Sequence, residues 1–565
     1  MKITRRRFLV FASVLFTFLG ATTNLAARNT WPQYSGTPAG PAAFIRTAGN
    51  RLVLPDGSPF LIKGIAFGNN IWNNPAHPDQ ITHHGPEDFF TVKKLGFNTI
   101  RFYLNYRLFE DDESPYRYKE SGFTWLENNI AAARSAGLYL ILNMHLPQGG
   151  YQSTGTGDAL WTDPENQKRL VSLWTEIARR YKDEETILGY GLVNEPVPVD
   201  GVAQWTTLAQ NIINGIRSVD TYHLLFVERA CWLKNEPTEA ERASLFFPQG
   251  LVDPGPHQNI VLEFHMYEPM DFTHQNAHWI ESLGATAASY PDETRILADG
   301  RKWAGFSDTG PALAAGTSRW RNLPGRPYRV TNPEFRIARP VIQAQGLGPD
   351  GIVYADSIEI KEYSPAGRLL RTMNFTPGAE GEIWYFWSQN GSGSATAVPR
   401  ISGARSAQTI QITGTTGDAN YGLSSRQFIV HQNHSYTISG RIRGENIPAD
   451  ALVRFRIDFD SADALYSWNK NYLESVIELY SGYSRTHSVP LYLGEFGSII
   501  YSFEQNRGGE RWVADMLEIL TAREINYTYH TYHETNFGLY TNTDSQLPDP
   551  TAINEKLRSV FLRWQ

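Results

Sequence analysis

The chain of 565 residues is longer than one ordinary domain, and its 41% hydrophobic and 13% aromatic content is typical of a folded protein with large cores. The formal net charge is −7, and no basic block follows residue 7. Because phosphate backbones are bound by clustered Lys and Arg, this charge pattern argues against nucleic acid as a partner.

Residues 1–27 are predicted to be a targeting signal. A short basic head that includes Arg5, Arg6 and Arg7 precedes an apolar run from Val10 to Gly20. An apolar stretch of this length fits a cleaved signal better than a membrane span, and the paired arginines resemble a twin-arginine signal. An ordinary secretory signal is the alternative. We expect an exported bacterial protein, periplasmic or extracellular, without membrane contact once the signal is removed, because no later run has about 18 apolar residues.

Cys231 is the single cysteine, so the chain cannot form an internal disulfide. It follows an apolar run, which favours a small, buried hydrophobic side chain. No spacing of Cys or His indicates a structural metal, and we expect neither a metal nor another cofactor.

Short apolar runs typical of strands recur along the chain, and amphipathic stretches fill several of the gaps. One helix is predicted to begin at Pro164, with Asp163 as its N-cap. This alternation predicts an α/β fold, a (β/α)8 TIM barrel over residues 44–294 and 466–565. A doubly wound sheet alternates similarly, but no glycine-rich phosphate loop follows the first run. The runs begin near Leu61, Thr99, Tyr139, Gly189, Leu224, Val261, Leu491 and Tyr527.

A gap of about 230 residues separates the sixth and seventh of these starts, which predicts a domain inserted between strand 6 and helix 6. Residues 311–462 show short alternating runs separated by Gly, Ser, Asn and Pro, a pattern typical of an all-β sandwich. The runs 352–360 and 436–443 loosely resemble strands of jelly-roll carbohydrate-binding modules, in a permuted order. Trp384, Tyr385 and Trp387 are candidate sugar platforms. Alternating aromatics also form sandwich cores, however, and the domain could instead brace the barrel or shape its cleft.

Two runs end on a glutamate, namely Gly-Leu-Val-Asn194-Glu195-Pro196 and Leu-Tyr-Leu-Gly494-Glu495-Phe496. A glutamate at the end of a buried strand is costly unless it is paired or faces a working cleft. The active sites of (β/α)8 barrels lie at the C-terminal ends of the strands, so we expect Glu195 and Glu495 to face each other. Cleavage of a glycosidic bond requires such a facing pair of carboxylates.

Other runs also end on polar residues. A single charged residue at a strand end is usually a solvated terminus, but six or seven such ends at one mouth indicate a functional site. These residues are Arg101, Asn143 with His145, Glu228 with Arg229, His265 with Tyr267, and the group His530, Tyr532 and His533.

Together these motifs resemble glycoside hydrolase family 5, the cellulase-like enzymes whose catalytic glutamates end strands 4 and 7. The resemblance covers the whole barrel. It rests on Asn194-Glu195-Pro196, Gly494-Glu495-Phe496-Gly497, Arg101 in Thr-Ile-Arg-Phe, His145, the pair His265 and Tyr267, and the opening run Leu61–Gly68.

The resemblance implies a role for each matching residue. Glu195 would be the acid/base and Glu495 the nucleophile, with the carboxyls roughly 5 Å apart, the spacing for retention. Arg101 and Tyr267 would favour the anion of Glu495. The remaining substrate-binding residues would be Asn194, at the sugar 2-OH, with His145 and His265, which would hold hydroxyls and orient the carboxylates.

The chain departs from the family at strand 8, where a Trp usually floors the subsite at the cleaved bond. Here His530 stands about where that Trp would be, and Tyr532 is a second candidate. Trp72, Trp161 and Trp279 fall in predicted loops on the same face. They are candidate sugar platforms, although loop tryptophans as often pin a loop to the barrel.

We therefore expect a secreted retaining β-glycosidase that hydrolyses a β-linked polysaccharide or oligosaccharide. A glucan such as cellulose is favoured, with mannan as the alternative. The same glutamates could instead transfer the glycosyl group, or hydrolyse a glycolipid or a small glycoside. A rival of a different class is a non-catalytic carbohydrate-binding protein on a disabled barrel, against which the intact glutamate pair argues.

Overall fold

The computed structural model describes residues 30–36, 43–71, 83–280, 288–377, 384–389, 391–423 and 427–564. The predicted targeting signal and Trp72 lie outside these residues. Among the described helices, none is both long and apolar enough to cross a bilayer.

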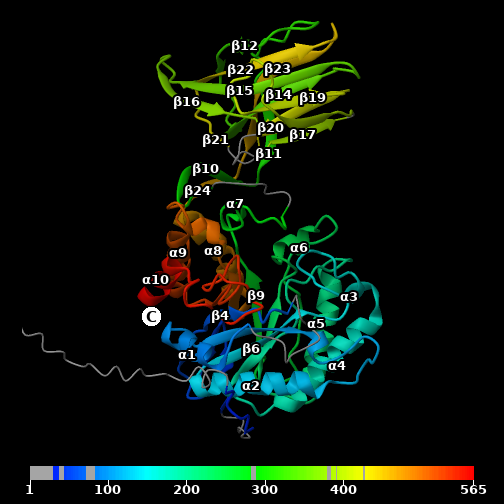
Figure 1. The fold of residues 1–565 in the computed structure, drawn as a ribbon, viewed down its shortest axis with the longest axis vertical. Coiled ribbons are helices and arrows are strands. Elements are labelled where there is room, and N and C mark those ends of the chain that lie inside the picture. The colour runs from blue at the N-terminus through cyan, green and yellow to red at the C-terminus, as the bar shows by residue number, and fades with distance from the viewer. Residues whose placement is uncertain are drawn as a thin grey trace, which may run out of the picture.

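Eight parallel strands close into a barrel, which confirms the predicted fold class (Figure 1). The order around the barrel is β25-β26-β4-β5-β6-β7-β8-β9. The strands are β4 (Lys63–Phe67), β5 (Thr99–Asn105), β6 (Tyr139–Leu146), β7 (Ile187–Gly191), β8 (Leu224–Glu228), β9 (Ile260–His265), β25 (Leu491–Phe496) and β26 (Asn526–Tyr529).

Helices surround the barrel, and the longer ones each bury one apolar face. The helix predicted at Pro164 is α4, and the Asp163 side chain accepts a hydrogen bond from the Glu165 backbone N–H at 2.9 Å. The helices are α1 (Pro86–Lys94), α2 (Glu120–Ala136), α4 (Pro164–Tyr181), α5 (Val202–Arg217), α8 (Lys470–His487), α9 (Gly509–Ala522) and α10 (Glu555–Arg563), with the short α3 (Ala159–Thr162), α6 (Glu239–Ala243) and α7 (Met270–Thr273).

A small antiparallel sheet near the start of the chain packs against the barrel interior. It consists of β1 (Arg46–Ala48), β2 (Arg51–Val53) and β3 (Pro59–Phe60). Leu52 shares a buried cluster with Ile141, Phe226 and Tyr492 on three barrel strands. This sheet lies at the N-terminal ends of the barrel strands, opposite the C-terminal ends where the site is expected.

The long insert leaves the barrel after β9 and returns at α8, the position that the sequence predicts. A two-stranded antiparallel ribbon of β10 (Asp292–Asp299) and β24 (Ala464–Trp468) connects the two parts (Figure 1). The sandwich already includes residues 302–306, before the predicted start at 311. The sequence prediction began too late because this strand has only five residues and a register shift at Gly305. It therefore lacks the alternation of polar and apolar residues by which strands are recognised.

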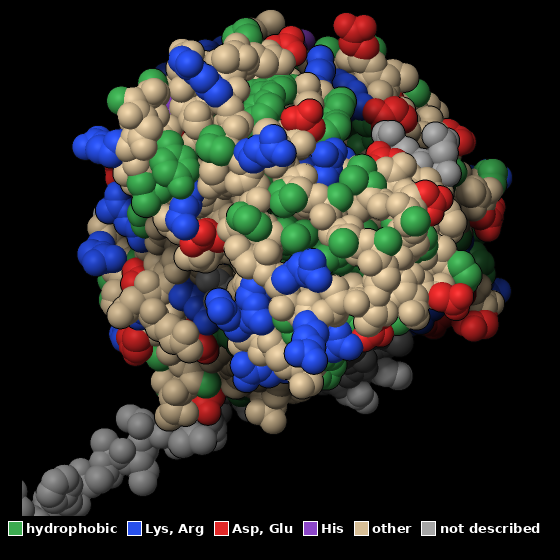
Figure 2. Space-filling model, turned by 90° about the horizontal axis from the view of Figure 1, so that it is seen from above, with side chains coloured by type: hydrophobic (Ala, Val, Ile, Leu, Met, Phe, Trp, Pro, Cys, Tyr) green, Lys and Arg blue, Asp and Glu red, His purple; other side chains and the backbone are tan. Residues whose placement is uncertain are grey.

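The insert is a sandwich of two antiparallel sheets around its own apolar core. One sheet has the order β11-β23-β14-β20-β17, with β21 paired to β14, and the other the order β12-β22-β15-β19-β18, with β13 and β16 attached. The strands are β11 (Lys302–Phe306), β12 (Arg321–Pro324), β13 (Tyr328–Arg329), β14 (Ile337–Gln345), β15 (Ile352–Tyr363), β16 (Leu369–Phe375), β17 (Trp384–Gln389), β18 (Ser394–Pro399), β19 (Gln408–Thr413), β20 (Asp418–Leu423), β21 (Phe428–Ile429), β22 (Ser435–Glu445) and β23 (Leu452–Ser461). Seen from above, this end of the molecule mixes basic, acidic and hydrophobic side chains (Figure 2).

Candidate active site

Glu495 lies at the C-terminal end of β25 and is held by three donors. The Arg101 guanidinium donates to its Oε1 at 2.6 Å, and the Tyr103 hydroxyl donates to the same oxygen at 2.6 Å. The Tyr267 hydroxyl donates to Oε2 at 2.8 Å. Hydrogen bonds to the charged form of a carboxylate favour that form.

The electrostatic surroundings of Glu495 favour its anion. Burial alone would raise the pKa of Glu495, but His265, His530 and Arg101 together hold it well below its ordinary value. The carboxyl is therefore ionised at neutral pH, and it is buried with 5% of its surface exposed. An ionised carboxylate at the end of a barrel strand is suited to nucleophilic attack.

Glu195 follows β7 in a backbone conformation that is unusual for a residue other than glycine, with φ of 44°. Its backbone N–H donates to Glu228 Oε2 at 2.8 Å, which anchors this turn to the end of β8. Burial raises the pKa of Glu228 well above its ordinary value, although the nearby His265 opposes this shift. The turn directs the Glu195 side chain toward β9.

The two glutamates meet at His265. The His265 Nδ1 atom lies 2.9 Å from Glu195 Oε1 and 3.6 Å from Glu495 Oε2. One carboxylate oxygen of each glutamate and this ring nitrogen all lie within 4.8 Å of one another. The structure thus brings together two carboxylates that are 300 residues apart in the chain.

His265 carries a positive charge between these carboxylates. Burial alone would lower the pKa of His265, but the carboxylates of Glu228 and Glu495 raise it well above its ordinary value. A positive charge on His265 offsets the repulsion between the two acids.

Arg101 is fully buried and connects several strand ends. Besides its bond to Glu495, its Nη2 atom donates to Asn194 Oδ1 at 2.9 Å and pairs with Glu263 at 2.9 Å. Asn194 therefore has a fixed orientation beside Glu195. Arg101 also satisfies two acidic groups with one cation, which keeps a buried charged cluster neutralised.

His145 and His530 complete the wall nearest Tyr103. The His145 ring stacks on the Tyr103 ring at a centroid distance of 3.9 Å, and burial lowers the pKa of His145 well below its ordinary value. His530 Nδ1 lies 2.9 Å from the Tyr103 hydroxyl and 4.0 Å from Glu495 Oε2. His530 thus lies at the site, at the strand end where the family that the motifs resemble usually has a Trp.

The structure corrects the proposal that Tyr532 binds substrate. Tyr532 is fully buried, its hydroxyl donates to Asp88 Oδ1 on α1 at 2.7 Å, and its ring packs on Phe67. Successive side chains alternate in direction along an extended chain, but the backbone turns after β26 and directs Tyr532 toward the helix layer. Trp161 is likewise buried, with its indole N–H bound to Gln152, whereas Trp279 is 42% exposed.

Sequence reasoning missed Tyr103 and Glu263. Both lie two residues from a residue that was identified, Tyr103 after Arg101 on β5 and Glu263 before His265 on β9. Because residues i and i+2 of a strand share a face, this spacing is the signal that could have found them.

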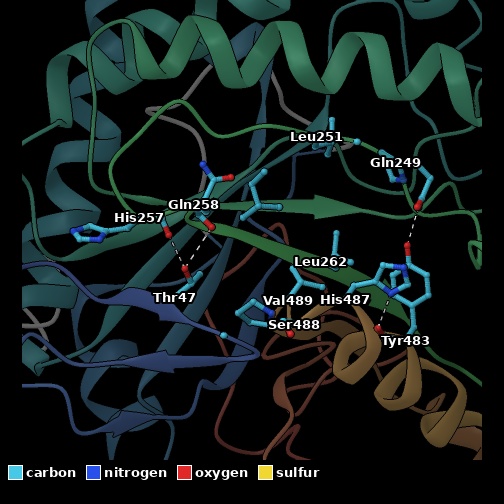
Figure 3. Close-up of a pocket in the computed structure, with 15 residues that line it drawn as sticks. Thr47, Gln249, Leu251, His257, Gln258, Leu262, Tyr483, His487, Ser488 and Val489 are labelled. Atoms are coloured by element: carbon cyan, nitrogen blue, oxygen red, sulfur yellow. Dashed lines mark hydrogen bonds between the residues drawn. The ribbon is translucent and has the colours of Figure 1, made fainter.

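A separate cavity of about 400 Å³ lies near the opposite ends of the strands. Residues before β9 and at the end of α8 line it, including His257, Gln258, Tyr483 and His487 (Figure 3). Since the glutamates lie at the C-terminal ends of the strands, this cavity is not the site of their chemistry.

The fold and the carboxylate pair define the class of glycoside hydrolases. Residues 54–306 match the model of one family, Cellulase (glycosyl hydrolase family 5). This match agrees with the family that the motifs of the sequence resemble.

Curated relatives are similar to part of the chain. Endoglucanase C of Acetivibrio thermocellus is 31% identical over 209 residues, which are 37% of this chain and 57% of that protein. The Beta-xylosidase of Phanerodontia chrysosporium is 29% identical over 222 residues, 33% of this chain and 46% of that protein. Cellodextrinase A of Ruminococcus flavefaciens is 25% identical over 226 residues, 40% of this chain and 63% of that protein. The chain thus spans less than two thirds of the length of these relatives.

Among solved structures, the endoglucanase Cel5A from Thermotoga maritima is 16% identical with a TM-score of 0.44, covering 88% of this chain and 96% of that one. The cellulose synthase subunit Z from Clostridioides difficile is 13% identical with a TM-score of 0.43, covering 89% and 100%.

Proposed function

We propose that the protein is a retaining glycoside hydrolase that acts on a β-linked glucan. The observation that carries this proposal is the approach of the Glu195 and Glu495 carboxylates to within 4.8 Å. Retaining enzymes place these groups about 5–5.5 Å apart, whereas inverting enzymes leave about 6.5–9.5 Å for a water molecule. The spacing favours direct attack by a carboxylate.

In the first half-reaction, Glu495 attacks the anomeric carbon and forms a glycosyl–enzyme ester. The bond to the leaving oxygen breaks, and Glu195 transfers its proton to that oxygen. The hydroxyl of Tyr267 and the guanidinium of Arg101 stabilise Glu495 before attack and release it as its charge is lost.

In the second half-reaction, a water molecule attacks the same carbon while Glu195 accepts its proton. The ester bond to Glu495 breaks, and the product keeps the β configuration. Asn194, fixed by Arg101, is placed to bind the sugar 2-OH, a contact that strengthens in the transition state.

The names of the relatives support the choice of substrate. Several are endoglucanases and one is a cellodextrinase, which favours a β-glucan over mannan. We also propose that the N-terminal signal exports the protein, because polymeric glucans occur outside the cell.

The test is a screen of defined β-glucans, mannan and xylan, with product stereochemistry followed by NMR. We expect β-glucan hydrolysis with retention, and loss of activity of several orders of magnitude in Glu195→Ala and Glu495→Ala. An aryl glycoside with a good leaving group should partly rescue the first step of Glu195→Ala, because that leaving group needs little protonation.

Other outcomes would contradict this proposal. A product of inverted anomeric configuration, or near wild-type rates in either variant, would rule out the double-displacement mechanism. Transfer products that dominate even without added acceptor sugar would favour a transglycosylase. Binding without turnover on every substrate would favour the non-catalytic rival.

We further propose that the sandwich binds polysaccharide on the outward face of the sheet β11-β23-β14-β20-β17. Ile342 and Phe455 point into the sandwich core, so the alternate residues Gln343, Arg454 and Arg456 point away from it. Aromatic rings flank these polar groups at both edges of the sheet. They are Trp303 and Phe306 on β11, and Tyr385 and Trp387 on β17.

Two observations favour a ligand on this face over mere packing. Trp303 is 59% exposed although it belongs to a sheet. Arg339 Nε and Nη1 and Asn420 Oδ1 are buried without a hydrogen-bond partner in the described part of the chain. Buried polar atoms are nearly always hydrogen-bonded, and sugar hydroxyls both donate and accept.

The test is co-sedimentation of the full chain with insoluble cellulose. We expect Trp303→Ala and Tyr385→Ala to weaken retention about 5-fold each while leaving hydrolysis of a soluble aryl glycoside unchanged, as for contacts worth about 1 kcal/mol. Leu479→Ala, which removes a 60% exposed side chain on α8, is the matched control. Equal retention of all three variants would exclude this face.

A further inference from the structure

A group of metal-ligating side chains lies in the sandwich, away from the glutamate pair. Glu362 is near the end of β15, and His431 and His434 belong to the turn between β21 and β22. The Nδ1 atoms of His431 and His434 lie 2.9 Å and 2.7 Å from Glu362 Oε1. The three ligand atoms lie within 4.8 Å of one another.

We propose that Glu362, His431 and His434 bind a divalent transition-metal ion, with zinc as the best fit. Imidazole nitrogen and a carboxylate oxygen are ligands that zinc accepts at about 2.0–2.2 Å. In a tetrahedral site such ligand atoms lie about 3.3 Å apart. The observed separations of 2.7 Å and 2.9 Å are close to this, so the rings need only a small outward shift.

The turn gives the ion access and room for a fourth ligand. The His431 side chain is 54% exposed and the His434 side chain 20% exposed. Water can therefore reach the site and complete the coordination, while the Glu362 side chain below is only 3% exposed.

Other groups already hold the carboxylate in place. The Tyr436 hydroxyl donates to Glu362 Oε1 at 2.8 Å, and Arg371 donates to Oε2. Arg371 occupies Oε2, which leaves Oε1 as the single oxygen for the ion. Such partners orient metal ligands and raise affinity.

The alternative is a hydrogen-bonded cluster that only braces the turn. The two differ in what they bind. A brace of this kind takes up no ion, whereas the proposed site takes up one ion and is stabilised by it.

The experiment measures uptake of Zn²⁺ by the full chain after treatment with EDTA, by equilibrium dialysis at pH 7.5. Two further donor groups share His265 in the barrel, so His265→Ala is measured alongside to separate any ion bound there. His487→Ala, on α8, is the matched histidine control. The sandwich variants are His431→Ala, His434→Ala and Glu362→Gln.

We expect one equivalent of Zn²⁺ that is lost in the three sandwich variants and kept in His265→Ala and His487→Ala. Added Zn²⁺ should raise the Tm of the wild type and not that of His431→Ala. Co²⁺ should give the visible absorption of a tetrahedral site in the wild type and the controls, and not in the three sandwich variants.

The proposal is overturned if the wild type takes up no Zn²⁺ or Co²⁺, or if His431→Ala takes up as much as the wild type. Hydrolysis of a soluble aryl glycoside reports that the barrel of each sandwich variant is folded. His431 is more than half exposed, so its truncation carries the test even if His434→Ala does not fold.

Discussion

Two buried carboxylates in different domains are held by similar sets of donors. Glu495 in the barrel accepts from Arg101 and Tyr267, and Glu362 in the sandwich accepts from Arg371 and Tyr436. In both, burial alone would raise the pKa of the carboxyl and the donors hold it lower.

What faces each carboxylate differs. Glu495 faces a second carboxylate, that of Glu195, across His265, whereas Glu362 faces two imidazole nitrogens. An ionised carboxylate beside an acid can take part in double displacement, and one beside imidazoles is a metal ligand or a brace. The comparison teaches that donors fix the charge state, while the opposing group decides the chemistry.

The largest expected effect comes from removing the charge of each carboxylate in turn. Glu495→Gln should lower kcat by several orders of magnitude, because the amide cannot attack the anomeric carbon. Glu362→Gln should leave kcat on a soluble aryl glycoside unchanged. Comparable losses of kcat in both variants would contradict the different roles assigned to Glu495 and Glu362.

Tyr103→Phe should lower kcat about 10- to 100-fold, since a hydrogen bond to a charged group contributes about 1.5–3 kcal/mol. The measurement is steady-state kinetics on the same substrate. Full activity in this variant would show that Tyr103 only supports the His145 ring.

Glu228→Ala should lower kcat about 10-fold, because the Glu195 backbone N–H loses its acceptor and its turn is no longer anchored. Glu228→Gln keeps an acceptor oxygen and no charge, so it should retain most of the activity. If the two variants are equally impaired, the carboxyl group of Glu228 is needed for more than accepting this hydrogen bond.

Stability should respond to acid in both regions. The pKa of each carboxyl is lowered on folding, so its stabilising contribution is present above the ordinary value of 4.5 and is lost as pH falls through the folded value. The Tm of the wild type should therefore fall more steeply below pH 4.5 than that of Glu495→Gln or Glu362→Gln. Parallel curves from pH 7 to pH 3 would contradict this.

The smallest effect is expected at Tyr532, outside both carboxylate sites. Tyr532→Phe should lower Tm by about 2–4 °C through loss of its bond to Asp88, with kcat unchanged. A reduced kcat with an unchanged Tm would instead support the prediction that Tyr532 binds substrate.

The sequence determined the barrel, the place of the insert and the residues at the strand ends. Parallel strands in a barrel carry their C-terminal ends to one rim, so a motif that ends a strand is placed by topology alone. That is why Glu195, Glu495, Arg101 and His265 could be identified from a linear pattern.

Only the tertiary structure decided which way each neighbouring side chain points and which distant groups meet. The turn after β26 directs Tyr532 to the helix layer and leaves His530 beside Glu495. Glu362 meets His431 and His434 because β15 and β22 pair in register, which brings together residues about 70 positions apart. Contacts of this kind depend on packing between separate elements, and no local period in the sequence encodes them.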